Sequence, residues 1–319
     1  MNFSRPSLRI GSRGSELALW QSNFIKLKLE ELYPDLLVSI TIIKTTGDKI
    51  LDSPLSVIGG KGVFTMELER ALMRNEIDIA VHSLKDLPTE LDSGLTIAAI
   101  PQREDVRDAF LSNNKDASLF DLPKGAKIAT GSLRRKAQIL ARRPDYEIID
   151  IRGNVPTRIR KLRESDWDGM ILAASGMKRL GLENEITHPI ATDEMLPAPG
   201  QGALAIEARE DDTEIAKLLF PLEDQVSRLS SATEREILHA LGGGCQLPLG
   251  TYVQKIGNEY SIDACIAYPT GEGMIRAQLH SNETGLKQAA INIAEKFLSE
   301  GGKEMIVNLT DAQKAEKNH

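Results

Sequence analysis

The sequence predicts an α/β protein with two doubly wound lobes joined by a hinge, followed by a small α+β domain at the C-terminal end. Its 319 residues exceed the size at which a single hydrophobic core keeps growing, so several domains are expected. Through most of the chain, short apolar runs alternate with amphipathic helical runs, which is typical of βαβ units. Near residue 222 this alternation gives way to one long helical run and several short strands.

The first lobe is predicted from residue 8 onward. Apolar periodicity indicates, in chain order, strand 8–11, helix 15–32, strand 38–44, helix 65–75, strand 77–82 and strand 95–100. Ser15 is the expected N-cap of the first helix, because its hydroxyl can accept a hydrogen bond from a free backbone N–H. The polar stretch 101–107 indicates a linker.

The second lobe repeats the rhythm, and parallel sheets covered by helices are expected. The pattern indicates, in chain order, strand 127–130, helix 133–142, strand 146–151, helix 155–164 and strand 169–173. The Pro- and Gly-rich segment 196–202 resembles a hinge, and 203–208 is expected to return to an earlier sheet as a strand. A two-lobed body with a cleft follows.

The C-terminal region is predicted as a helix at 224–241, strands near Tyr252, Ile262 and Ile275, and a helix at 285–299. The polar tail after Thr310 is expected to be frayed. The expected domains are therefore 1–101 with 200–220, then 102–199, and finally 221–319.

Composition excludes several classes of protein. A net charge of −7 and 4% aromatic residues argue against a nucleic-acid-binding surface. No apolar run is long enough to span a bilayer and the start has no apolar signal region, so a cytoplasmic location away from membranes is expected. The two cysteines form no C-x-x-C pair and no histidine stands at zinc-ligand spacing, so neither a metal nor a structural disulfide is predicted.

Three predicted helix starts have the chemistry of anion sites. They are the segments 11–15, 130–135 and 152–155, each with a capping residue and an arginine. Between residues 124 and 163 there are 12 Lys or Arg against 3 Asp or Glu. Ordinary helix capping and a solvated basic helix face remain the alternatives. No phosphate-binding glycine motif is present, so carboxylates are the favoured anions.

Lys85 and Asp86 follow an apolar strand and should project from the end of a sheet toward the cleft. A carboxylate beside a lysine can stabilise a cation or move a proton. The alternative is a turn, since Asp before x-Pro is common in turns. His82 is expected to be structural rather than a base.

Cys245 follows three glycines, where little side-chain packing surrounds it and the backbone can approach a ligand closely. Cys265 instead lies in an apolar run and is expected to be a core residue. Packing remains the alternative for Cys245 as well. No nucleophile elbow or Cys-His protease signature is present, so a thiol that carries a group fits better than one that hydrolyses.

Seven motifs occur in an order that resembles the porphobilinogen deaminases, also called hydroxymethylbilane synthases, transferases of haem and tetrapyrrole biosynthesis. These motifs cover residues 11–21, 59–64, 81–88, 131–135, 151–155, 199–202 and 242–248. The resemblance implies a dipyrromethane cofactor joined by a thioether to Cys245. Porphobilinogen, which bears acetate and propionate side chains, would lose ammonia to give an azafulvene that the cofactor's terminal pyrrole attacks. After four additions, hydrolysis would release hydroxymethylbilane, and the family is expected to act as a monomer.

The resemblance also implies roles for individual residues. Asp86 would stabilise the pyrrole and azafulvene cations and handle protons. The cofactor would be held by Ser83, Lys85, Asp86, Ser132, Arg134, Arg135 and the Cys245 thioether, and the substrate by Arg13, Ser15, Arg152, Arg158 and Arg179. Segment 49–61 would act as a lid, with Lys61 and Phe64 at the cleft. Two positions depart from the family. Gly131 stands where many relatives have serine, and Pro156 stands where relatives often have other residues; it lies early in the helix, where proline is tolerated.

The strongest rival from another class is a two-lobed solute-binding or effector-sensing protein, because the predicted lobes are of the periplasmic-binding-protein kind and such proteins often bind carboxylates. Architecture alone does not distinguish the enzyme hypothesis from the binding-protein hypothesis. No helix-turn-helix pattern precedes the first strand, and a simple binder has no need of Cys245 or Asp86. A cysteine-dependent hydrolase is the third reading, and it lacks a visible base.

Overall fold

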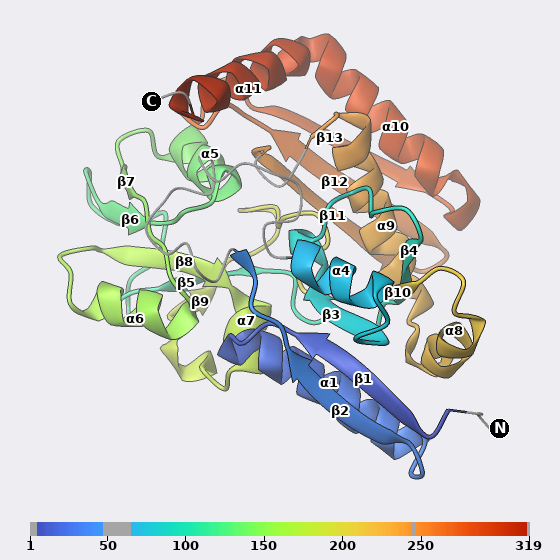
Figure 1. Ribbon diagram of the computed structural model, residues 1–319. Coiled ribbons are helices and arrows are strands. Elements are labelled where there is room, and N and C mark those ends of the chain that lie inside the picture. Colours follow the sequence, from blue (N-terminus) through green and yellow to red (C-terminus); the bar gives the residue numbers. More distant parts are fainter. Residues whose placement is uncertain (1–4, 47–64, 244–246, 318–319) are drawn as a thin grey trace. The chain divides into compact units, whose positions relative to one another are not determined.

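The computed structural model describes residues 5–46, 65–243 and 247–317 (Figure 1). Backbone packing divides the chain into two compact units. Unit 1 comprises Met1–Glu104 and Ala203–Arg228, and unit 2 comprises Asp105–Gly202 and Leu229–His319. Two five-stranded sheets and one three-stranded sheet, with helices packed beside them, confirm the predicted class of two α/β lobes and a small α+β domain.

The sheet of unit 1 has the order β2-β1-β3-β10-β4. Its strands are β1 (Ser7–Ser12), β2 (Leu37–Ile42), β3 (Ile79–Ser83), β4 (Leu95–Ala99) and β10 (Leu204–Arg209). β1 is parallel to both β2 and β3, whereas β10 is antiparallel to β3 and β4. The predicted return of the 203–208 segment to this sheet is therefore confirmed.

Among the described residues of unit 1, three helices accompany this sheet: α1 (Glu16–Leu32), α4 (Met66–Met73) and α8 (Thr213–Leu219). The core forms where Ile25 and Leu29 of α1 and Leu218 of α8 meet the buried side chains of Leu8 and Ile206. α1 and α4 lie where the sequence predicts helices. α8 was not predicted, because seven residues give too short a run for a clear helical period.

The order of the strands in unit 1 reverses between β1 and β3. From β1 the chain passes through α1 to β2 at one edge, and from β2 it passes through α4 to β3 on the other side of β1. Ligands of doubly wound sheets bind at the carboxyl ends of the strands that flank such a reversal. In unit 1 those ends lead to Ser15 and to the segment 83–86.

The first sheet of unit 2 has the order β7-β6-β8-β5-β9. Its strands are β5 (Asp108–Leu111), β6 (Lys127–Ala129), β7 (Glu147–Ile149), β8 (Gly169–Ala173) and β9 (His188–Pro189). Its helices are α5 (Leu133–Arg142), α6 (Val155–Arg163) and α7 (Ala174–Arg179). Strand order reverses here between β6 and β8. The ends of β6 and β7 lead into α5 and α6, which are two of the three predicted anion sites.

The expectation of parallel sheets is wrong for two strands. β10 is antiparallel to its neighbours in unit 1, and β5 is antiparallel to β8 and β9 in unit 2. Each enters its sheet shortly after the chain has crossed from the other unit. Neither arrives through the helical crossover that makes neighbouring strands parallel.

The C-terminal part of unit 2 contains the third sheet, β11-β12-β13, whose strand pairs are antiparallel. Helix α9 (Gln225–Ala240) begins in unit 1 and continues into this part. The elements that follow are β11 (Leu249–Ile256), β12 (Glu259–Ile266), β13 (Ile275–Ser281), α10 (Leu286–Phe297) and α11 (Lys303–Lys317). α10 lies along this sheet, and its apolar side packs into the same core as β12 (Figure 1).

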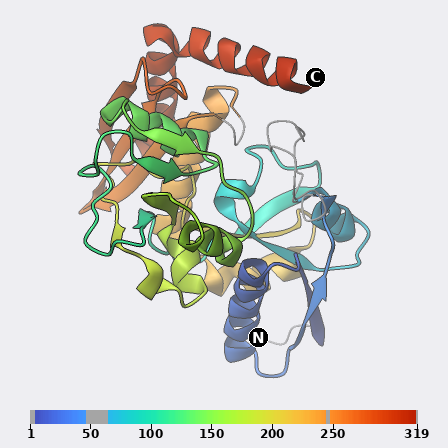
Figure 2. The ribbon, with the colours of Figure 1, turned by 90° about the vertical axis from the view of Figure 1, so that its left-hand side faces the viewer.

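The predicted fraying after Thr310 is wrong. A bend at Gly301, whose φ is 107°, ends the preceding helix, and α11 then runs on to Lys317 (Figure 2). Met305 at the start of α11 is buried in the core of the third sheet. This contact anchors a helix that the polar sequence beyond it does not indicate.

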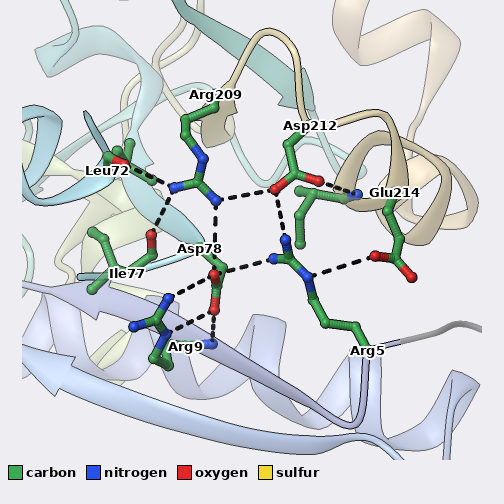
Figure 3. A network of polar contacts seen from close by, with 9 residues as sticks. Arg5, Arg9, Leu72, Ile77, Asp78, Arg209, Asp212 and Glu214 are labelled. Atoms are coloured by element: carbon green, nitrogen blue, oxygen red, sulfur yellow. Dashed lines mark hydrogen bonds and ion pairs between the residues drawn. The ribbon is translucent and has the colours of Figure 1, made fainter. Parts of the chain in front are cut away.

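A network of charged side chains joins distant segments of unit 1 (Figure 3). Asp78 accepts hydrogen bonds from the Arg9 backbone N–H (2.8 Å) and from the guanidinium groups of Arg9 and Arg5. Asp212 accepts from Arg5 and Arg209, both at 3.0 Å. The network therefore holds β1 against the turn between β10 and α8.

This network predicts a loss of stability in acid. Burial acts to raise the pKa of Asp78, but hydrogen bonds from Arg9 outweigh it and lower that pKa. A carboxylate whose pKa is lower in the folded chain stabilises it above the unfolded pKa, and this stabilisation is lost as the pH falls through the folded pKa. We expect the free energy of unfolding to fall below about pH 4, and to fall less in Asp78→Asn.

Urea unfolding at about pH 7 and at about pH 3 measures this dependence. The matched control is Asp35→Asn, which changes an exposed acid of the same unit and should keep the acid dependence of the unchanged chain. An Asp78→Asn chain as acid-sensitive as that control would contradict the prediction.

Candidate functional site

The carboxyl end of β3 presents Lys85 and Asp86 on the outside of unit 1. A short 3-10 helix, Leu84–Asp86, follows the strand directly. Leu84 and Leu87 are buried, at 0% and 2% exposure, and the Leu84 N–H donates to the carbonyl of Ala203 at 3.0 Å. These anchors leave Lys85 half-buried and Asp86 exposed between them. The strand end thus offers a carboxylate to solvent on a fixed turn.

The start of α1 lies beside this turn. Ser15 caps the helix as predicted, and its Oγ accepts a hydrogen bond from the Ala18 N–H at 3.3 Å. One turn later, Nε2 of Gln21 donates to Oγ of Ser83 at 2.8 Å. This bond brings together two segments that the sequence assigned separately to the site, while Arg13 is half-buried just before the cap.

Behind the turn lies a buried pair, His82 and Glu207. His82 Nε2 is 2.9 Å from Glu207 Oε2, and the two side chains are 5% and 0% exposed. The nearby Glu69 has a raised pKa, chiefly because it is buried, and Glu207 adds to the effect. His82 is therefore placed inside the sheet rather than at its solvent edge.

In unit 2, Arg134 and Arg135 follow Ser132, which caps α5 with its Oγ 3.5 Å from the Arg135 N–H. Both arginines are buried and share one carboxylate, Asp108, on β5. Nη1 of Arg134 donates to Asp108 Oδ2 at 2.8 Å, and Nε and Nη2 of Arg135 donate to Oδ1 at 3.1 and 2.8 Å. Burial acts to raise the pKa of Asp108, but the two guanidinium groups hold it far below its usual range. Asp108 is therefore ionised.

Gln201, in the segment predicted as a hinge, completes this cluster. Its Nε2 donates to Asp108 Oδ1 and to the Val106 carbonyl, both at 2.8 Å, and its side chain is fully buried. Neither Asp108 nor Gln201 was singled out from the sequence, although Gln201 lies within a quoted motif. Asp108 had no local signal, because the strand that carries it was not predicted.

The start of α6 lies close to the start of α5. Asn154 caps α6 through a 3.0 Å bond from the Thr157 N–H, and Pro156 occupies the first turn as expected. A Cβ on Gly131 would lie 2.8 Å from the carbonyl oxygen of Ile151. Glycine at position 131 therefore permits this close approach, and a serine there would require a shift.

The remaining predicted arginines of unit 2 already have partners within the chain. Arg158 Nε donates to the Gly153 carbonyl at 2.7 Å, and Nη2 of the buried Arg179 donates to the Gly202 carbonyl at 2.6 Å. Nε of Arg152 lies 3.7 Å from Oδ2 of Asp150. Arg152 and Arg158 thus lie at the start of α6, whereas Arg179, the last residue of α7, is held against the 196–202 segment.

Three predicted site residues, Cys245, Lys61 and Phe64, lie outside the described residues. Cys265 is 1% exposed in β12, and burial raises its pKa to about 11. Its thiol is therefore protonated at neutral pH, as expected for a core cysteine.

Within residues 5–46, 65–243 and 247–317, no three or more His, Cys, Asp or Glu side chains are grouped so as to hold a metal ion. No helix in the same ranges is long and apolar enough to cross a membrane.

Two family models match the chain. Residues 8–217 match the model described as porphobilinogen deaminase, dipyromethane cofactor binding domain, and residues 229–299 match that of the porphobilinogen deaminase C-terminal domain. The chain belongs to the porphobilinogen deaminase family. The family resemblance found in the motifs is thereby confirmed.

Curated porphobilinogen deaminases resemble the chain over nearly their whole length. That of Syntrophomonas wolfei is 50% identical over 93% of this chain and 96% of its own, and that of Geobacter sulfurreducens is 46% identical over 95% and 94%. Among solved structures, the methionine-binding protein MetQ aligns with 72% of this chain and 93% of its own, with 14% identity and a TM-score of 0.42.

Several of the side chains described above fit an acidic pyrrole cofactor. The cofactor-domain model covers both strand-order reversals, with Ser83 and Asp86 in unit 1 and Arg134 in unit 2. Arg134 donates through Nη1 alone, and its Nε and Nη2 form no hydrogen bond with any residue that the structure describes. Such an N–H pair matches the two oxygens of a carboxylate.

Proposed function

We propose that this chain deaminates porphobilinogen and joins four molecules of it head to tail on a dipyrromethane primer, and that water then cleaves the bond to the primer and releases hydroxymethylbilane. The primer is linked by a thioether to Cys245. The observation that carries the proposal is the position of Ser83 at the end of β3 and of Lys85 and Asp86 on the fixed turn that follows, inside the region that matches the cofactor-binding model.

Asp86 is the catalytic residue. When ammonia leaves porphobilinogen, the bond between the methylene carbon and nitrogen breaks and positive charge develops on the pyrrole. An exposed carboxylate on a rigid turn is already oriented toward that charge, so it stabilises the transition state without reorganisation. The same carboxylate accepts the proton lost when the new carbon–carbon bond forms.

The cationic and hydroxyl side chains bind the acids of the pyrroles. When bound, the dipyrromethane supplies the free α-carbon to which each new unit is joined. We assign its carboxylates to Ser83, Lys85, Ser132, Arg134 and Arg135, and those of the substrate to Arg13, Ser15, Arg152, Arg158 and Arg179. The assignments at the starts of α1, α5 and α6 are supported by helix dipoles that favour anions at the strand ends. The assignment of Arg179, the last residue of α7, rests on the family resemblance alone.

Several features of the whole chain belong to the same proposal. The lid role that the family resemblance implies for segment 49–61, with Lys61 and Phe64, belongs to the proposal, and these residues lie outside the described ranges. The chain works as a monomer in the cytoplasm and folds as three domains, 1–101 with 200–220, 102–199 and 221–319. The three separate sheets support this division.

The proposal is tested by the intact mass of the purified, denatured chain. We expect the mass to exceed that of the bare sequence by a two-ring dipyrromethane, because a thioether survives denaturation. The excess should disappear in Cys245→Ser and remain in Cys265→Ser, the matched control at the buried cysteine. An unmodified mass in the unchanged chain would refute the covalent primer.

A further inference from the structure

Asp108 is a buried acid among arginines that the proposed function assigns to carboxylate ligands. It is the first residue of β5, it is fully buried, and both of its oxygens accept hydrogen bonds from guanidinium groups. A negative side chain at an anion site repels the ligand directly, so its presence there requires an explanation. The contacts of Asp108 with the two arginines give that explanation.

The cluster carries one positive charge in excess. Arg134 and Arg135 contribute two positive charges and Asp108 contributes one negative charge, while Gln201 is neutral. The other acceptors are uncharged backbone carbonyls, those of Leu196 for Arg134 and Ile171 for Arg135. An uncompensated buried charge is costly, and one carboxylate of a ligand would balance it.

The two arginines use Asp108 differently. Arg135 turns its Nε and Nη2 edge to Asp108 Oδ1 and its Nη1 to the Ile171 carbonyl at 3.0 Å. Arg134 reaches Asp108 and the Leu196 carbonyl, at 2.8 and 2.6 Å, through Nη1 alone. Its Nε and Nη2 edge, the geometry that binds carboxylates in a bidentate manner, forms no bond within the described part of the chain.

We propose that Asp108 is a positioning residue for cofactor binding: it fixes both arginines so that Arg134 offers its Nε and Nη2 edge to a carboxylate of the dipyrromethane. Asp108 also reduces the charge of the cluster to the single positive unit that this carboxylate neutralises. The inference rests on the proposed function and adds a residue that never touches the ligand.

The alternative hypothesis is that Asp108 only offsets positive charge, and it predicts the opposite effect of Asp108→Asn on ligand binding. If Asp108 only offset positive charge, Asp108→Asn would leave two excess positive charges and would bind an acidic ligand more strongly. If Asp108 positions Arg134, the same substitution weakens binding, because Arg134 loses the partner that orients it.

The experiment compares full-length chains by the fraction that carries the covalent two-ring adduct, measured as intact mass. We expect Asp108→Asn to lower that fraction about 10-fold, the effect of losing a hydrogen bond to a charged group. Arg134→Gln should do the same, and the double variant should be no worse than Arg134→Gln alone, because Asp108 acts through Arg134. The matched control is Asp105→Asn, which removes an acid paired with Arg107 and Lys178 in the same unit and should load normally.

Thermal unfolding of each variant separates lost loading from lost structure. If Asp108→Asn does not fold, Arg134→Lys decides the question, because lysine keeps the positive charge beside Asp108 but has no bidentate edge. Loss of loading in a folded Arg134→Lys chain supports the proposal. Normal loading in either folded variant, Asp108→Asn or Arg134→Lys, overturns it. An unchanged chain with no adduct would instead refute the proposed function itself.

Discussion

Replacing Asp86 by asparagine is expected to remove most turnover while leaving the proposed dipyrromethane adduct on the chain. Asparagine keeps the size of the side chain and one oxygen, but it loses the negative charge that the proposed mechanism places beside the developing cation. Removing one preorganised electrostatic group lowers kcat by about 10²–10³-fold, which corresponds to about 3–4 kcal/mol of transition-state stabilisation. The side chain is exposed on its turn, so the fold should tolerate the change.

Three measurements check this result: release of product from porphobilinogen, intact mass and thermal unfolding. Asp92→Asn is the matched control, because it changes an exposed acid a few residues further along the same loop and should keep full turnover. Asp86→Glu keeps the charge and should retain part of the rate. Turnover of Asp86→Asn equal to that of the control would remove Asp86 from the chemistry.

Elements with strong local signals were predicted to within a residue or two. Helix α5 and strand β8 have the predicted bounds, because Ser132 marks the start of one and a continuous apolar run forms the other. β5 was missed because it has four residues and is defined by pairing with β8, whose residues come much later in the chain. A strand of that length carries no period of its own.

In the candidate site, too, features set by neighbouring residues were predictable from the sequence, and contacts between distant residues were not. Ser15, Ser132 and Asn154 were recognisable as caps because a cap bonds to its own helix. The partners that hold the site are distant in sequence: Gln21 is 62 residues from Ser83, and Glu207 is 125 residues from His82. The spacing of residues along the sequence does not indicate such contacts.

Arg134 and Arg135 show how partners that were not predicted from the sequence change the interpretation of a site. From the sequence, Arg134 and Arg135 were equivalent donors at the start of a helix. In the structure both are buried against Asp108, and they differ in which edge of the guanidinium is used. Their partners distinguish them: Arg134 donates to Asp108 and the Leu196 carbonyl, and Arg135 to Asp108 and the Ile171 carbonyl. All of these partners are distant in the chain, so no local pattern indicates them.

A second large effect is expected at Glu234, a fully buried acid of α9. Its Oε2 accepts a hydrogen bond from the Gly200 N–H at 2.7 Å, and its Oε1 accepts one from the Val253 N–H at 2.9 Å. The side chain thus connects α9 to the 196–202 segment and to β11 within unit 2. Truncation in Glu234→Ala would leave both buried donors without an acceptor, at a cost of about 2–5 kcal/mol in the free energy of unfolding.

Urea unfolding at neutral pH measures this loss, with the midpoint and slope recorded separately. Glu234→Gln keeps one oxygen and should lose roughly half as much stability, since a single amide oxygen replaces one of the two acceptors. Glu236→Ala, a half-buried acid two residues further along the same helix, is the matched control and should change stability far less. Equal losses in Glu234→Ala and Glu236→Ala would show that the two backbone bonds contribute nothing. A graded series, in which alanine costs most and the control least, would identify Glu234 as the residue that joins α9 to the segment carrying Gln201, and hence to the cluster around Asp108.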